Sequence, residues 1–165
     1  MKSIKKSNYT SCLGCATGCC ASFNRLQPPA FTATEFLAVQ KYDKALPPFK
    51  KSGYFYYPEI KTQQCSLFKP KQGCQIYKDR PIDCKLWPFS IMMRDDVPWL
   101  VLYWSVCCEK LDKEWIANFI ATDKVRALGL ISSYGEKNIM NYAFMQNSRL
   151  TREKFVWVCK IVPNQ

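Results

Sequence analysis

Four cysteines fall within nine residues near the amino terminus, at positions Cys12, Cys15, Cys19 and Cys20. Thiols at this density form disulfides or converge on a metal ion, and the choice between the two constrains the whole fold. The chain has 10 cysteines in 165 residues, which is well above ordinary usage but below the density of small disulfide scaffolds. Because it contains no histidine, a site for a soft metal has to be built from thiolates, with or without a carboxylate.

The redox compartment decides between these two outcomes. Lysines occur in 1–8, but the polar run 7–10 follows where a secretory signal would carry its apolar segment. The longest apolar stretch, 97–108, is too short to span a bilayer, so we expect no membrane span. We therefore expect a cytoplasmic protein, in which clustered thiols favour metal or redox chemistry over structural disulfides.

The net charge is basic, but it depends on the state of the cysteines. The formal value of +11 counts every cysteine as a neutral thiol. A centre of four thiolates around zinc or an iron–sulfur cluster carries about −2, so two such centres would leave about +7. The charges are scattered, which favours a solvated basic surface and leaves a protein partner open. Nucleic acid is the less favoured partner, and segment 50–57, which interleaves lysines with aromatic residues, would be its stacking surface.

The length fits one domain over 1–165, with a cysteine-rich region at about 10–90 and a helical part at about 110–160. A capping box at Thr32 and Glu35, together with helical spacing further on, predicts three helices: 33–45, 113–127 and 136–146. Aromatic and β-branched runs predict strands at 54–60 and 97–106, while 155–159 fits either a strand or a short helix.

Two short features refine the ends of these elements. Gly129 is predicted to end the helix over 113–127. Asp95 and Asp96, the only adjacent carboxylates, could bind a hard cation but are more simply a polar turn before the strand at 97–106.

A second cysteine region lies between 61 and 90, where Cys65, Cys74 and Cys84 follow one another at intervals of nine and ten residues. Turn signals accompany them, so these thiols would approach a common centre from loops. In the opening quartet, the adjacent Cys19 and Cys20 point to opposite sides of an extended chain. They therefore fit two sites, or one site and one packing role, better than a single tetrahedral ion.

Polar neighbours of Cys84 carry further expectations. Pro81 sets the turn before this cysteine, and Arg80 is expected to donate hydrogen bonds to a thiolate sulfur or to a loop carbonyl. Asp79 and Asp83 are expected to pair with nearby bases. Aromatic side chains close to the cysteines would shield a metal cluster or belong to the ordinary core: Tyr9, Phe68, Tyr77, Trp87 and Phe89.

The segment 73–84 reads GCQIYKDRPIDC, and Trp87-Pro88-Phe89 follows it. Together with the opening cysteines, these residues resemble the YkgJ-type CxxCxxCC family of zinc- or iron-chelating domains, to which the flagellin lysine methylases are distantly related. The resemblance covers about 10–90. Three residues rather than two precede the Cys-Cys pair, and 65–68 inverts the usual aromatic–aliphatic order, but neither departure removes a ligand.

We therefore expect a small single domain of the α+β class, mainly helical with a few short strands, whose cysteine-rich loops surround a metal centre. The resemblance implies a cofactor bound by thiolates, either an iron–sulfur cluster of the 4Fe-4S type or zinc. The predicted ligands are Cys12, Cys15, Cys19, Cys20, Cys65, Cys74, Cys84, Cys107 and Cys108, the last two as alternatives for one position. Cys159 is expected to pack in the core.

The expected role of the centre is structural or electron-carrying. One alternative is a cluster-dependent enzyme that modifies proteins, similar to a lysine methylase, and its catalytic residues are unknown. The other is a zinc-stabilised module that binds nucleic acid. Without histidine, a Ser–His–Asp or Cys–His arrangement is excluded, so the sequence leaves open whether the chain is an enzyme.

Overall fold

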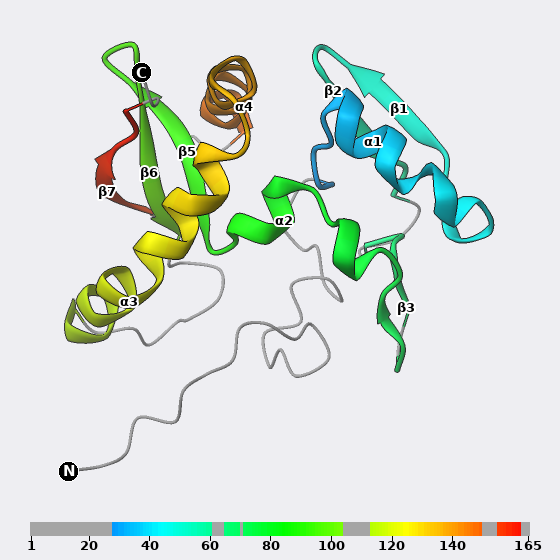
Figure 1. Cartoon of the computed structure of the whole chain (residues 1–165), viewed down its shortest axis with the longest axis horizontal. Helices are drawn as coiled ribbons and strands as arrows, with labels where there is room; N and C mark the ends of the chain where they lie inside the picture. The colour runs from blue at the N-terminus through cyan, green and yellow to red at the C-terminus, as the bar shows by residue number, and fades with distance from the viewer. Residues whose placement is uncertain (1–27, 61–64, 70, 104–112, 150–154, 163–165) are drawn as a thin grey trace.

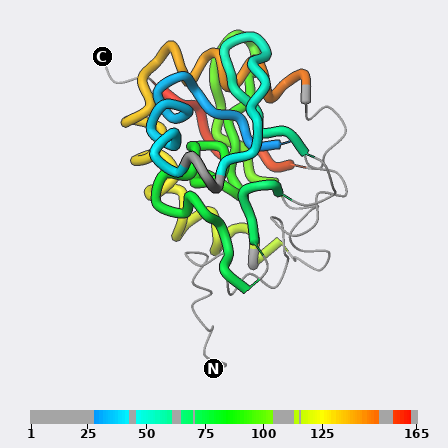
Figure 2. Tube along the Cα trace, turned by 90° about the vertical axis from the view of Figure 1, so that its right-hand side faces the viewer, coloured from blue at the N-terminus to red at the C-terminus, as the bar shows by residue number. Residues whose placement is uncertain are grey.

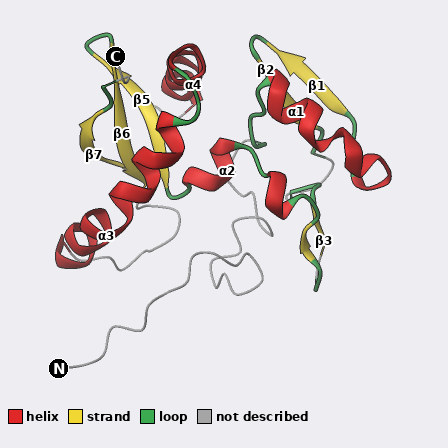
Figure 3. Ribbon diagram, in the orientation of Figure 1, coloured by secondary structure: helices red, strands yellow, loops and turns green. Residues whose placement is uncertain are grey.

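The computed structural model describes residues 28–60, 65–69, 71–103, 113–149 and 155–162. Within these ranges the fold mixes helices with short antiparallel strands, as expected for an α+β protein. Figure 1 shows two groups of elements with the short helix α2 between them, and Figure 3 shows the same view by secondary structure. The opening cysteines and the pair at 107–108 lie outside the described residues.

The larger group is built on a three-stranded antiparallel sheet of order β5-β6-β7. Its strands are β5 (Phe89–Arg94), β6 (Val97–Tyr103) and β7 (Phe155–Lys160). The segment at 155–159 is thus a strand, and the buried strand predicted from position 97 is confirmed as far as the description extends.

Asp95 and Asp96 form the turn between β5 and β6, with φ angles of 51° and 57°. Two successive residues in the left-handed region define a type I′ turn, whose twist matches that of a two-stranded hairpin. The predicted polar turn is confirmed.

Two long helices, α3 (Lys113–Ser132) and α4 (Glu136–Arg149), belong to the same group. The predicted end of α3 at Gly129 is wrong, because the helix continues through this glycine. A glycine inside a helix costs only about 1 kcal/mol, and Ile131, which is 1% exposed, prolongs the buried stripe. Gly135, with φ of 80°, separates α3 from α4 instead.

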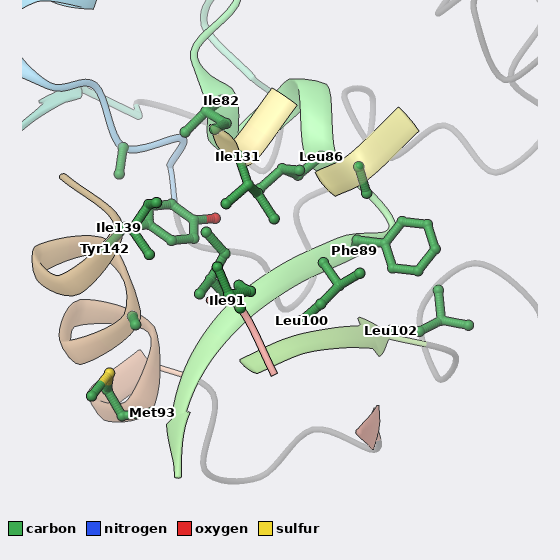
Figure 4. Close-up of a cluster of buried hydrophobic side chains, with 14 of the residues drawn as sticks. Ile82, Leu86, Phe89, Ile91, Met93, Leu100, Leu102, Ile131, Ile139 and Tyr142 are labelled. Carbon is green, nitrogen blue, oxygen red and sulfur yellow. The ribbon is translucent and has the colours of Figure 1, made fainter. Parts of the chain in front are cut away.

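The main hydrophobic core lies where α2, α3 and α4 meet the sheet. Figure 4 shows the ring of Tyr142 from α4 among Ile91, Ile131 and Ile139. Leu100 at the centre of β6 is fully buried. Removing this side chain would leave a cavity, so burial here holds the sheet and helices together.

The smaller group contains α1 (Ala33–Val39), which continues as a 3₁₀ helix over Gln40–Ala45, and the hairpin of β1 (Phe49–Ser52) and β2 (Phe55–Pro58). The predicted capping box is present at the start of α1. The Glu35 amide donates to Thr32 Oγ1 at 3.3 Å, and the Thr32 amide donates to Glu35 Oε2 at 2.9 Å.

The second cysteine region links the two groups. It contains β3 (Phe68–Lys69), β4 (Gly73–Cys74), a 3₁₀ turn at Tyr77–Asp79 and α2 (Ile82–Leu86). In the side view of Figure 2 the two groups overlap along the line of sight, and Ala30 and Phe55 from the smaller group belong to the main core. None of the described helices is both long and apolar enough to cross a membrane.

Candidate metal centre

Three predicted ligands lie in the described part of the chain, on three different local structures. Cys65 begins the turn that leads into β3, where its carbonyl accepts a hydrogen bond from the Phe68 amide at 2.9 Å. Cys74 lies in β4, directly opposite Phe68. Cys84 lies in the middle of α2.

The first two cysteines are embedded in a second hydrophobic cluster, beneath α1 and the β1–β2 hairpin. Cys65 is 7% exposed, and Cys74 is half-buried. Other members of this cluster include Phe31, Val39 and Ile76. The thiols are therefore held on packed structure and not on exposed loop tips.

The electrostatics of Cys84 show that the three thiols share one neighbourhood. Burial raises the pKa of the Cys84 thiol well above its ordinary value of 9.0, and the adjacent Asp83 carboxylate raises it further. Smaller increases come from Cys65 and Cys74, whereas Arg80 lowers the pKa. Such an influence requires proximity. No disulfide joins the cysteines that the structure describes.

The described thiols do not form a complete site. Across the described ranges, no three or more cysteine and acidic side chains are arranged so that they could hold a metal ion. Four thiolates are the usual complement of a histidine-free zinc or iron–sulfur site. The predicted ligands Cys12, Cys15, Cys19, Cys20, Cys107 and Cys108 lie outside the described residues.

Ser66 offers a test of whether this neighbourhood suits a thiolate-bound group. Its hydroxyl oxygen is buried and has no hydrogen-bond partner among the described residues. A buried polar group left unsatisfied costs about 1–3 kcal/mol. A thiolate or sulfide within reach would accept this hydroxyl hydrogen, so the orphaned donor is compatible with a metal–sulfur group nearby.

Two carboxylates fix the first turn of α2, which carries Cys84. Glu35 Oε1 accepts the Ile82 amide hydrogen at 2.7 Å, and Asp83 Oδ2 accepts the Ala30 amide hydrogen at 2.9 Å. Glu35 therefore serves the first turns of both α1 and α2. The capping-box pattern identified its role in α1, but no local signal pointed to its bond with Ile82, 47 residues away.

Asp83 makes hydrogen bonds to α4 that the sequence did not indicate. Asp83 Oδ1 accepts hydrogen bonds from the hydroxyl of Tyr142 and, at 3.1 Å, from Gln146 Nε2. These donors are neutral and belong to α4. The short polar side chain of Asp83 thus joins α2 to the helix that follows it by more than fifty residues.

The expectations for Arg80 and Asp79 are confirmed. Arg80 Nε donates to the Tyr77 carbonyl at 3.0 Å, and its guanidinium lies 3.9 Å from the centre of the Tyr77 ring. Asp79 Oδ2 lies 2.8 Å from Lys41 Nζ and accepts the Tyr42 hydroxyl hydrogen at 2.7 Å. These bonds to Lys41 and Tyr42 lower the pKa of Asp79.

The aromatic residues near the cysteines divide between two roles. Phe68 packs in the same cluster as Cys65 and Cys74. Phe89 belongs to the main core, and Trp87 stacks on Tyr103 with ring centres 5.9 Å apart. Tyr9 lies outside the described residues.

Cys159 lies apart from the other described cysteines, whereas Tyr56 of the lysine–aromatic segment packs in the same cluster as Cys65 and Cys74. Cys159 in β7 is paired with Leu100 and packs against the main core, as expected, and burial raises the pKa of its thiol. In segment 50–57, Tyr56 is stacked on Phe36 at 4.3 Å between ring centres, with Lys51 over the same ring. This ring is therefore occupied by intramolecular packing.

The described helices and short antiparallel strands define a small protein of the α+β class. The family model CxxCxxCC, described as "Putative zinc- or iron-chelating domain", matches residues 11–119, more than half of the chain, and the chain belongs to this family. The match includes both cysteine regions and ends within α3, so α4 and β7 lie beyond it. Comparisons with curated proteins and with solved structures gave no match.

Proposed function

We propose that this protein holds a metal centre through cysteine thiolates from both cysteine regions. The centre is an iron–sulfur cluster of the 4Fe-4S type or zinc, and its role is structural or electron-carrying. The proposed ligands in the described chain are Cys65, Cys74 and Cys84. The remaining thiolates come from Cys12, Cys15, Cys19, Cys20 and one of the pair Cys107 and Cys108.

The observation that carries this proposal is that a thiol on a turn and a thiol on a strand both act on the thiol of a helix. Cys65 and Cys74 each raise the pKa of Cys84, which supports a common centre for the three, and no disulfide joins the described cysteines. Thiolate is the ligand that zinc and iron–sulfur clusters share. The family to which the chain belongs supports zinc or iron as the metal.

Other residues prepare the site for a negatively charged group. The Arg80 guanidinium favours the thiolate form of Cys84, and the buried Ser66 hydroxyl is available to a sulfur acceptor. Glu35 and Asp83 hold the helix that presents Cys84. When bound, zinc would supply a rigid cross-link between loops, whereas an iron–sulfur cluster would also accept and release single electrons.

The metal content of three proteins tests the proposal. We expect protein purified without oxygen to contain stoichiometric iron with sulfide, or stoichiometric zinc. The double variant Cys74→Ser with Cys84→Ser should lose most of this metal, because two of the proposed ligands are removed. Cys159→Ser is the matched control and should keep its metal, because Cys159 packs in the main core. Elemental analysis and an anaerobic absorption spectrum provide the measurements.

Each outcome of that experiment has a distinct meaning. A brown protein with a visible sulfur-to-iron band identifies the cluster, and a colourless protein with zinc identifies a structural site. Zinc together with nucleic-acid binding that weakens steeply with salt would support the nucleic-acid-binding alternative. A protein purified without metal, or a Cys159→Ser variant that loses it, would contradict the proposed ligand set.

Metal affinity should rise steeply with pH. Burial raises the pKa of Cys84, so this thiol keeps its proton at neutral pH in the metal-free protein, and metal binding has to release that proton. Each thiol ligand that is protonated before binding contributes roughly one unit to the slope of log affinity against pH. Competition with a chelator between pH 6 and 8 measures this slope. An affinity independent of pH would argue against thiol ligands.

A further inference from the structure

We propose that Tyr142 and Gln146 of α4 are positioning residues that hold Cys84 in place for metal binding. This inference rests on the proposed function, since it assigns Cys84 to the metal centre. Neither residue carries a metal ligand group suited to zinc or iron–sulfur coordination in this site. Their action is exerted through Asp83, the neighbour of Cys84 on α2.

The contacts form a closed polar group in the core. The Tyr142 hydroxyl donates to Asp83 Oδ1, and Gln146 Nε2 donates to the same oxygen at 3.1 Å. Gln146 Nε2 also donates to the Tyr142 oxygen at 2.7 Å, and Ser90 Oγ lies 3.4 Å from that oxygen. The two side chains of α4 thus bind each other as well as the carboxylate.

Burial makes this geometry specific. The side chains of Tyr142 and Gln146 are 0% and 4% exposed, so water cannot replace a bond that is lost. Hydrogen bonds to a charged carboxylate are roughly twice as strong as those between neutral groups. A partly satisfied buried network is unstable, which restricts Asp83 to one position relative to α4.

The position of Asp83 determines that of Cys84, because the two residues are adjacent in a helix of five residues. The other Asp83 oxygen accepts the Ala30 amide hydrogen, and Glu35 accepts the amide of Ile82. The first turn of α2 is therefore held from α4, from α1 and from the segment before α1. Ligand distances in metal sites are fixed to within about 0.2 Å, so a small shift of this turn would weaken binding.

The positioning contacts come from outside the family match. That match covers residues 11–119, whereas α4 spans Glu136–Arg149. The C-terminal part of this chain thus supports the centre by orienting one thiol. Outer hydrogen bonds that orient a metal ligand typically change metal affinity by 10–100-fold when removed.

A residue of the same helix provides the control. Asn147 exchanges two hydrogen bonds with the backbone of Met93 in β5, at 2.8 and 2.9 Å. It anchors α4 to the sheet, and these two hydrogen bonds go to β5 and not to α2. Asn147→Ala should therefore lower stability without changing the orientation of Cys84.

The test measures binding of Co²⁺, used alone as a probe, to metal-stripped Tyr142→Phe, Gln146→Leu and Asn147→Ala. The thiolate-to-cobalt absorption band reports the geometry at sulfur, and competition with a chelator reports affinity. We expect Tyr142→Phe and Gln146→Leu to weaken Co²⁺ binding at least tenfold and to change the band. Asn147→Ala should match the original protein in Co²⁺ affinity and in its absorption band, even if its melting temperature falls.

The outcomes separate this inference from the function on which it rests. If the original protein binds Co²⁺ through thiolates but both α4 variants bind it equally well, the positioning role is wrong and the metal centre stands. If the original protein gives no thiolate band with Co²⁺, the positioning role is wrong; if it also contains neither iron nor zinc as purified, the proposed function fails as well. If Tyr142→Phe does not fold, Gln146→Leu still tests the positioning role, because it also removes a donor to Asp83 Oδ1.

Discussion

Removing the metal should lower the melting temperature of this protein by on the order of 10 °C or more. Ligands from distant parts of the sequence have to be gathered against chain entropy, so metal binding and folding are coupled. A loss of about 4 kcal/mol would suffice, since a protein of this size loses roughly 2–4 °C for each kcal/mol. Thermal unfolding followed by circular dichroism, with and without a strong chelator, measures the effect.

The double variant Cys74→Ser with Cys84→Ser supplies the control for this result. Without chelator it should melt at the lower temperature of the stripped protein. With chelator, it and the original protein should melt at nearly the same temperature, because the stabilisation lost is that of the metal. A stripped original protein that melts as high as the loaded one would show that the centre does not support the fold.

Replacing Glu35 with alanine should destabilise the protein by about 3 kcal/mol. This carboxylate accepts hydrogen bonds from the Ile82 amide at 2.7 Å, the Thr32 amide at 2.9 Å and the Tyr134 hydroxyl at 3.3 Å. Without it these donors lose their acceptor in a part-buried setting, and the first turns of two helices lose a cap. Burial and the Glu35 charge also raise the pKa of Tyr134, in agreement with a close contact.

Chemical denaturation of Glu35→Ala measures this loss, and two variants sharpen it. Glu35→Gln keeps one acceptor oxygen and should fall between the alanine variant and the original protein. Glu59→Ala removes an exposed glutamate and should change stability by less than about 0.5 kcal/mol. Equal stabilities for Glu35→Ala and Glu59→Ala would show that the hydrogen bonds of Glu35 do not stabilise α2.

Helix starts and turns were predictable where residues close together in the sequence form the structure by themselves. Thr32 and Glu35 form a capping box within one turn, and Asp95 and Asp96 form a two-residue hairpin turn. Each pattern works over two to four residues, so it operates before any tertiary contact is made. The helix predicted from position 113 is present as α3, and its signal was the helical spacing of apolar residues along the segment.

Predictions failed where packing outweighed a local preference. Gly129 was expected to end α3, but the buried contact of Ile131 carries the helix past it. The segment 155–159 fitted two structures equally, and pairing with β6 selected the strand. The hydrogen bonds from the buried donors Tyr142 and Gln146 to Asp83 Oδ1 were not predicted by any local pattern.

The amino-acid sequence by itself determined the chemistry open to this protein, because ten cysteines without a histidine leave thiolate as the soft-metal ligand, and their spacing gives the family. The tertiary structure decided which groups meet. It brings Glu35 to Ile82 across 47 residues and Tyr142 to Asp83 across 59. Contacts at such separations follow from how helices pack on the sheet, since no interaction between near neighbours in the chain can specify them.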